Sequence, residues 1–127
     1  MTRTELNKFR QILEAKQAEL AEILRRREEI AVEKVPDTLD EVTRAAEREL
    51  AIRNLDREST LLRNVRAALR RLNDGTFGVC AHCGRDINPK RLAAVPWAPF
   101  CISCQNAADN NEREARETLS NLLLNSA

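Results

Sequence analysis

Hydrophobic residues recur at alternating spacings of three and four along the first part of the chain. Residues 4–33 contain no Gly or Pro, so nothing in this stretch breaks a helix. Lys16 and Arg27 fill the two gaps in the pattern. The apolar positions are Leu6, Phe9, Leu13, Leu20, Ile23 and Ile30. This heptad spacing predicts a helix that pairs with another helix in a coiled coil.

A second stretch without Gly or Pro covers residues 40–73 and has one apolar stripe, with Glu58 in its gap. It ends at Asn73, Asp74 and Gly75, a typical helix stop. The stripe consists of Ala51, Leu55, Leu62, Val65, Leu69 and Leu72. Between the two helices, Pro36 disfavours helix in the residue before it. The sequence therefore predicts a turn near residues 34–42.

Two helices of this length joined by a short turn should fold back as an antiparallel hairpin. Folding about Asp37 brings the apolar positions of both helices together. The expected pairs are Leu6–Leu69, Phe9–Val65, Leu13–Leu62, Leu20–Leu55, Ile23–Ala51, Lys16–Glu58 and Arg27–Arg48. The alternative is a compact bundle of ordinary amphipathic helices.

Residues 74–104 differ from the rest of the chain in composition. They hold all three Gly, three of the four Pro and all four Cys. From Cys101 onward the chain is again predicted to be helical, with Ala108, Ala115, Leu119 and Leu122 on one face. We therefore expect a mainly α protein with two domains. Residues 1–73 form the hairpin, and residues 74–127 form a small module with a C-terminal helix.

The cysteines follow the pattern C-x2-C-x17-C-x2-C, formed by Cys80, Cys83, Cys101 and Cys104. Two paired cysteines in a tight turn can direct both sulfurs at one ion, so this spacing predicts a single Zn²⁺ site. Four protein ligands leave no open position for water, and the zinc should be structural. The alternatives are a redox dithiol pair or two disulfides. His82 lies between the first two ligands and is expected at the surface.

Composition narrows the functional classes. Lys and Arg number 21 against 20 Asp and Glu in 127 residues, and aromatic residues make up only 3%. This excludes a strong overall field for a polyanion and makes a sandwich, barrel or dinucleotide-binding domain improbable. No segment has the apolar length of a signal peptide or membrane span, so we expect a cytoplasmic protein without a membrane partner. With one His and a closed metal site, an enzyme is not expected.

The same cysteine spacing occurs in GATA-type DNA-binding fingers. Residues 105–117 carry four acidic residues against two Arg, whereas duplex binding requires cations at phosphates. Sequence-specific DNA binding is therefore not expected. The alternative function is a zinc-finger DNA-binding or adaptor protein that dimerises through its coiled coil. The predicted hairpin favours a monomer.

The combination of hairpin, acidic turn, four-cysteine finger and final helix resembles the DksA/TraR family of bacterial RNA polymerase regulators. The resemblance covers residue 36 to the last helix. It is carried by RNLDRE at 53–58, DGTFGVCAHCG at 74–84, RLAAVP at 91–96 and the pair Cys101 and Cys104. It implies a factor that binds RNA polymerase directly and inserts the hairpin tip into the secondary channel, without binding promoter DNA.

The family tip carries the motif D-x-x-D-x-A, which corresponds here to Asp37, Asp40 and Val42. Valine thus replaces the family alanine, and the resemblance leaves the regulatory output open. On the residues alone, both acids could simply cap a helix. The resemblance also implies polymerase contacts by three arginines, Arg53, Arg57 and Arg91.

Family members that respond to guanosine tetraphosphate (ppGpp) use basic residues at the hairpin base, in the finger and after its last cysteine. The matching positions here are Asn64, Val95 and Gln105. None of these side chains is a cation that could pair with phosphate. We therefore expect a weak or absent ppGpp response.

Overall fold

The computed structural model describes residues 1–32 and 41–125. These residues form helices α1 (Arg3–Val32), α2 (Glu41–Asp74), α3 (Pro89–Ala94) and α4 (Ile102–Asn125). They divide into two compact units, Met1–Phe77 and Gly78–Ala127. The predicted domain boundary after residue 73 lies four residues before this division and stays a prediction.

Local hydrogen bonds define the start of α1 and the end of α2. At the start of α1, the backbone N–H of Glu5 donates to Thr2 Oγ1, and Glu5 Oε2 accepts from the backbone N–H of Thr2. This reciprocal pair is a capping box. At the end of α2, Gly75 adopts a φ of +76°, and the Thr76 N–H donates to the Arg71 carbonyl. That bond is typical of a Schellman stop, which requires the left-handed conformation that Gly tolerates.

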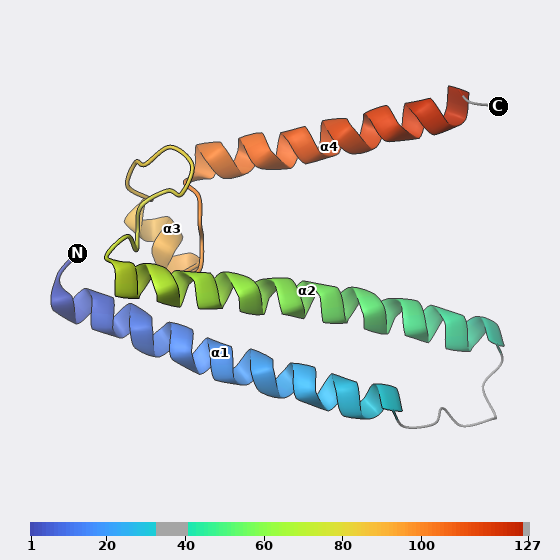
Figure 1. The fold of residues 1–127 in the computed structure, drawn as a ribbon, viewed down its shortest axis with the longest axis horizontal. Coiled ribbons are helices and arrows are strands. Elements are labelled where there is room, and N and C mark those ends of the chain that lie inside the picture. The colour runs from blue at the N-terminus through green and yellow to red at the C-terminus, as the bar shows by residue number, and fades with distance from the viewer. Residues whose placement is uncertain (33–40, 126–127) are drawn as a thin grey trace. The chain divides into compact units, whose positions relative to one another are not determined.

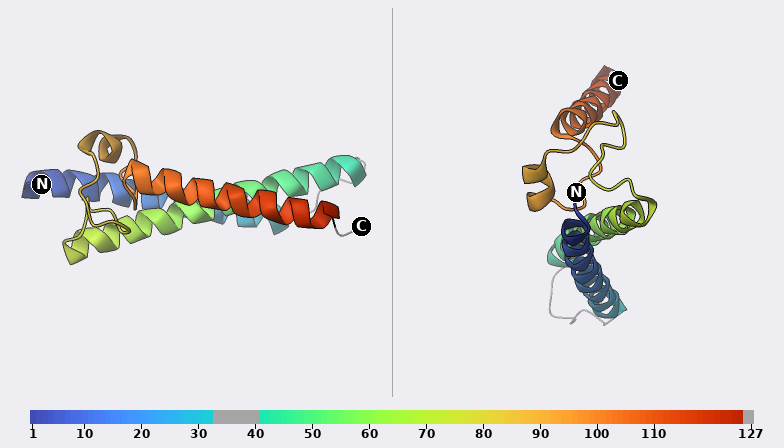
Figure 2. Two further views of the ribbon diagram at one scale, coloured as in Figure 1. Left: turned by 90° about the horizontal axis from the view of Figure 1, so that it is seen from above. Right: turned by 90° about the vertical axis from the view of Figure 1, so that its left-hand side faces the viewer.

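Helices α1 and α2 lie side by side and antiparallel (Figures 1 and 2). The buried core of the hairpin consists of Leu13, Leu20, Leu62, Val65 and Ala68. The antiparallel two-helix hairpin and the mainly α class predicted from the sequence are confirmed.

The predicted register of the hairpin is wrong. Arg27 donates from Nε and Nη2 to the two carboxylate oxygens of Glu58, with an Nη2–Oε1 distance of 2.7 Å. Lys16, the predicted partner of Glu58, lies eleven residues earlier on α1, about 16 Å along the helix axis. Arg10 likewise donates to Asn73 Oδ1 at 2.9 Å. Both pairs are centred near residue 42 and not on Asp37.

In the corrected register, the first part of α2 extends past the last residue of α1. In Figure 1, α2 begins beyond the point where α1 ends. The described side chains from Val42 to Arg53 are exposed, except for half-buried Arg44. Ala51, which the sequence placed in the apolar seam, is therefore exposed. A heptad pattern repeats every seven residues, so the apolar stripe alone could not choose between shifted registers.

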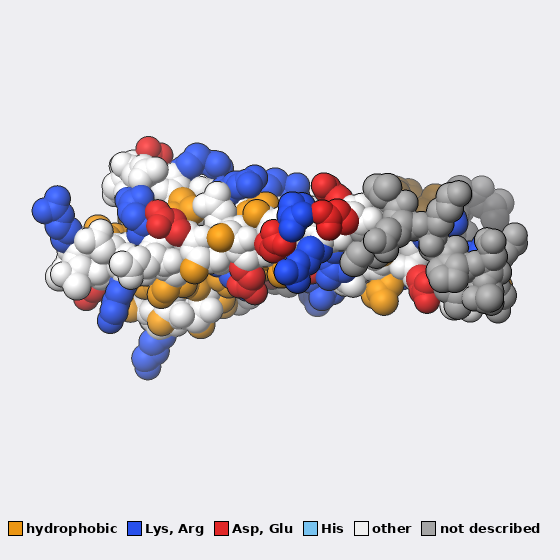
Figure 3. Space-filling model, turned by 90° about the horizontal axis from the view of Figure 1, so that it is seen from below, with side chains coloured by type: hydrophobic (Ala, Val, Ile, Leu, Met, Phe, Trp, Pro, Cys, Tyr) orange, Lys and Arg blue, Asp and Glu red, His pale blue; other side chains and the backbone are white. Residues whose placement is uncertain are grey.

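Short-range ion pairs lie on the exposed faces of the helices. Arg25 pairs with Glu22 and Glu29, each at 2.6 Å, and Arg116 pairs with Glu112 at 2.7 Å. Acidic and basic side chains lie next to one another on the face drawn in Figure 3. Surface pairs of this kind contribute little stability but favour a helical, solvated surface.

The second unit is small and has few buried side chains. Val79 and Asp86 form an isolated antiparallel β-bridge, and the Ile87 N–H donates to the Gly78 carbonyl. Asn88 caps α3 by accepting from the Lys90 N–H at 2.9 Å. The buried residues of this unit are Gly78, Cys80, Ile87, Leu92, Pro96 and Ala98. Helix α4 contains no buried residue, and none of the described helices could span a membrane.

Candidate metal centre

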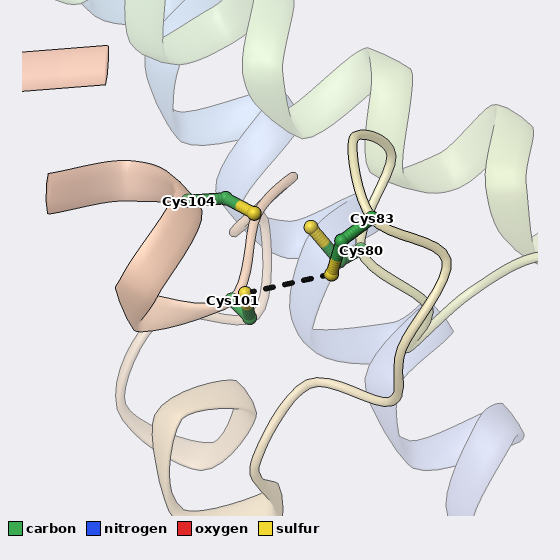
Figure 4. A group of neighbouring side chains, drawn as sticks. All are labelled: Cys80, Cys83, Cys101 and Cys104. Carbon is green, nitrogen blue, oxygen red and sulfur yellow. Dashed lines mark hydrogen bonds between the residues drawn. The ribbon is translucent and has the colours of Figure 1, made fainter. Parts of the chain in front are cut away.

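Two separate segments bring the four cysteines together. Cys80 and Cys83 lie in a tight turn. In this turn the Gly84 N–H donates to the Cys80 carbonyl, and the Cys80 N–H donates to the Arg85 carbonyl. Gly84 closes this turn with a φ of +74°, a conformation that favours Gly. Cys101 immediately precedes α4, and Cys104 lies in its first turn. Figure 4 shows the side chains of the two pairs facing one another.

The sulfur geometry fits a tetrahedral metal ion. All four Sγ atoms lie within 4.8 Å of one another, and those of Cys83 and Cys101 are 3.8 Å apart (Figure 4). Four sulfurs at about 2.3 Å from one zinc ion would be about 3.8 Å apart at the corners of a tetrahedron. All four cysteines are free thiols, and His82, which is exposed, is not part of this cluster. The thiols are therefore positioned to bind one zinc ion.

Backbone N–H groups favour the thiolate form of two of the four cysteines, Cys80 and Cys101. Burial raises the pKa of the Cys80 thiol, but N–H groups of Cys83, Cys101 and His82 outweigh it and lower that pKa to about 6. The backbone N–H of Cys104 similarly lowers the pKa of Cys101. The hydrogen bond between the side chains of Cys104 and Cys101 raises the pKa of Cys104 to about 12, because the proton is held there. A bound Zn²⁺ would replace that proton as the charge that offsets the thiolates.

The predicted tip residues are only partly described. Asp37 and Asp40 lie outside the described residues. Val42 is the second residue of α2, and its side chain is 79% exposed. The valine that replaces the family alanine is therefore available to a partner and plays no part in the hairpin core.

The three arginines predicted to contact a partner have different surroundings. Arg53 is exposed and pairs with Glu49 at 2.9 Å, and Arg57 is exposed. Arg91 is half-buried, and its Nε donates to the Phe100 carbonyl at 3.1 Å. Sequence reasoning missed this bond, which connects α3 to the segment before Cys101. No motif in the sequence signals it, because it depends on how the loop returns to the helix.

Comparison with known proteins places the cysteines in a described zinc finger. The prokaryotic dksA/traR C4-type zinc finger family matches residues 75–110, a range that contains all four cysteines. The chain is 35% identical over 117 residues to the RNA polymerase-binding transcription factor DksA of Escherichia coli. That alignment covers 90% of this chain and 78% of the relative. The DksA of Haemophilus influenzae is 34% identical, with 81% of its length covered.

Solved structures agree with this comparison over most of the chain. Transcription factor DksA2 from Pseudomonas aeruginosa is similar with a TM-score of 0.73 and 30% identity, covering 89% of each chain. The DnaK suppressor protein from Agrobacterium tumefaciens is similar with a TM-score of 0.57 and 35% identity. That match covers 80% of this chain and 91% of the other. The likeness thus includes the hairpin as well as the finger.

Proposed function

The chain belongs to the DksA/TraR family, and on this premise we propose that it is a transcription regulator that binds bacterial RNA polymerase directly. One observation carries the proposal. A helical hairpin and a four-thiol cluster occur in the same chain, and 35% identity to an RNA polymerase-binding factor extends over 90% of that chain. A zinc finger alone would support only a metal-binding module.

The hairpin supplies the shape that such a regulator needs. Helix α1 has 30 residues and is therefore about 45 Å long, a narrow rod that can enter a channel. We infer from the family that this rod enters the secondary channel of the polymerase. The tip residues Asp37, Asp40 and Val42 would then meet the polymerase near its active centre, and Arg53, Arg57 and Arg91 would make further contacts with it.

The zinc ion in this proposal has a structural role. Cys80, Cys83, Cys101 and Cys104 hold it, and four sulfur ligands leave no position for a reacting water. The ion takes the place of a larger apolar core in a unit that buries few side chains. We propose a cytoplasmic, monomeric and non-enzymatic protein without sequence-specific DNA binding.

The response to ppGpp is proposed to be weak or absent. Asn64 is half-buried, Val95 caps α3, and Gln105 donates to Asp109 at 3.0 Å. None of these three side chains can supply the positive charge that a tetraphosphate would need at these positions. Stabilisation of the polymerase complex by ppGpp that is lost on mutating Asn64 or Gln105 would overturn this proposal.

A pull-down of the cognate RNA polymerase with the zinc-loaded protein tests the main proposal. The wild type is expected to bind. Asp40→Asn should bind polymerase as well as the wild type does but lose its effect on transcription. The control variant Glu28→Gln removes the same charge from an exposed position on α1 and should change neither polymerase binding nor transcription. Cys83→Ser should lose zinc and then polymerase binding.

The same experiment can contradict the proposal. If the zinc-loaded wild type fails to bind polymerase, the family likeness is one of architecture alone. A sedimentation mass near twice 14.4 kDa, together with duplex binding, would instead support a dimeric DNA-binding adaptor.

A further inference from the structure

Positive charge is concentrated in the second half of α2. Residues 59–73 contain four Arg and no Asp or Glu, although the whole chain has a net charge of only +1. Glu58, which pairs with Arg27, lies directly before this segment, and Asp74 lies directly after it. Although the chain as a whole is nearly neutral, this segment has a local excess of about four positive charges. The field of such an excess extends over about one Debye length, about 8–10 Å.

Three of these arginines share one exposed face of α2. Arg63, Arg66 and Arg70 follow one another at steps of three and four, so they lie in a row about 10 Å long. All three are exposed, whereas the opposite face of the same segment carries the buried residues Val65 and Ala68. We call Arg63, Arg66 and Arg70 the arginine stripe.

The arginine stripe has no carboxylate partner within residues 1–32 and 41–125. Arg63 donates only to the Thr60 hydroxyl, at 3.0 Å, which leaves its charge uncompensated. Other exposed arginines, such as Arg25 and Arg116, form ion pairs with a glutamate one turn away. Burial lowers the pKa of the adjacent Arg71, and the like charge of Arg70 lowers it further. The stripe thus differs from the ion-paired faces around Arg25 and Arg116.

The neighbours of the stripe indicate what it can bind. The side chains beside the stripe are small or polar: Ser59 and Thr60 lie one turn before Arg63, and Ala67 lies between Arg66 and Arg70. A protein interface generally needs a large apolar or aromatic anchor, and this face has none. A phosphate backbone needs only guanidinium groups and small hydrogen-bond donors such as hydroxyls. The surface therefore fits nucleic-acid phosphates better than an acidic protein.

We propose that the arginine stripe is a nucleic-acid backbone site that binds phosphates without reading sequence. Three guanidiniums in a row about 10 Å long can contact several phosphates of one strand, since neighbouring phosphates are separated by about 3.4 Å along a duplex axis. Contacts to phosphate position a protein but carry no base information. The site is thus compatible with the absence of sequence-specific DNA binding, and it goes beyond polymerase binding.

Fluorescence anisotropy with the purified zinc-loaded full chain tests the proposal without polymerase. The probes are labelled poly(dT), poly(rU) and a mixed-sequence duplex of about 20 nucleotides or base pairs, and poly-glutamate serves as the acidic peptide. Titrations between about 50 and 200 mM salt give the slope of log affinity against log salt. We expect dissociation constants of about 10⁻⁶ to 10⁻⁴ M for the nucleic acids near physiological salt, and weaker binding of poly-glutamate.

A matched pair of triple variants locates the site. Arg63→Gln, Arg66→Gln and Arg70→Gln together should weaken poly(dT) binding about tenfold and reduce the salt slope by about 2, or 0.7 for each lost phosphate contact. Arg25→Gln, Arg26→Gln and Arg116→Gln remove the same charge elsewhere and should change affinity less than about twofold. Arg→Lys at the three stripe positions preserves charge and should retain most of the salt slope.

The outcomes separate the proposal from simple charge attraction. Equal loss of affinity in both glutamine triples, no binding by the wild type, or equally tight binding of poly-glutamate would each overturn it. Circular dichroism and zinc content confirm that each variant is folded. Polymerase pull-downs with the same variants are read separately, so failure of this inference leaves the proposed function untouched.

Discussion

A single ion pair reveals how the two helices of the hairpin align. Arg27 and Glu58 are only partly exposed, at 35% and 19% for their side chains, and form a bidentate contact between α1 and α2. The hydrogen bond to Glu58 raises the pKa of Arg27. Each residue fills a gap in the apolar pattern of its own helix. A polar pair within an apolar seam favours one register over its shifted alternatives.

Reversing these charges tests the register directly. Glu58→Arg should lower the melting temperature, because it places two guanidiniums together, and adding Arg27→Glu should restore most of that loss. Combining Glu58→Arg with Lys16→Glu, the partner expected from the apolar pattern alone, should restore nothing. Thermal unfolding followed by circular dichroism measures the four proteins. Rescue by Lys16→Glu would contradict the observed register.

The core of the hairpin lies in one part of its length. Leu13 and Val65 are fully buried, whereas Leu50 and Ile52, on the part of α2 that extends past the end of α1, are 58% and 60% exposed. Leu13→Ala should therefore cost about 2–5 kcal/mol of unfolding free energy through lost burial and a cavity. Ile52→Ala should change it by less than about 0.5 kcal/mol. Urea unfolding measures both; similar losses would show that the first part of α2 is also packed.

The zinc finger depends on its ion more than the hairpin does. The second unit buries only a few apolar residues, among them Ile87, Leu92 and Ala98. Removing zinc with a chelator should therefore abolish hydrogen-exchange protection across residues 78–104. Amides around Leu13 and Val65 should keep their protection, because the hairpin core contains no metal ligand. Equal loss in both segments would show that the hairpin requires the finger to fold.

At the scale of the whole molecule, the features that can be predicted from the sequence are those that depend on residues close together in the chain. Heptad spacing predicts the two long helices, and the cysteine spacing predicts the cluster of four thiols, because both depend on neighbours in the chain. The sequence does not predict the register between α1 and α2 or the hydrogen bond from Arg91 to the Phe100 carbonyl. Both require knowledge of how distant segments meet, and a repeating apolar pattern allows several answers.

The corrected register also changes what is expected of the tip. Since α2 continues beyond the end of α1, Val42 lies at the start of a segment in which most described side chains are exposed, and its own side chain is 79% exposed. Val42→Ala removes no core contact and raises helix propensity by about 0.5 kcal/mol. Polymerase affinity and melting temperature should therefore stay nearly unchanged.

Transcription should respond, because in the proposed function Val42 contacts the polymerase and Val42→Ala restores the family residue there. We expect the variant to act more strongly than the wild type in multiple-round transcription by the cognate polymerase, at a promoter that the wild type affects. Leu50→Ala, on the same exposed segment but two turns from Val42, is the matched control and should leave transcription unchanged. Equal activity of Val42→Ala and wild type would show that the valine does not limit the output.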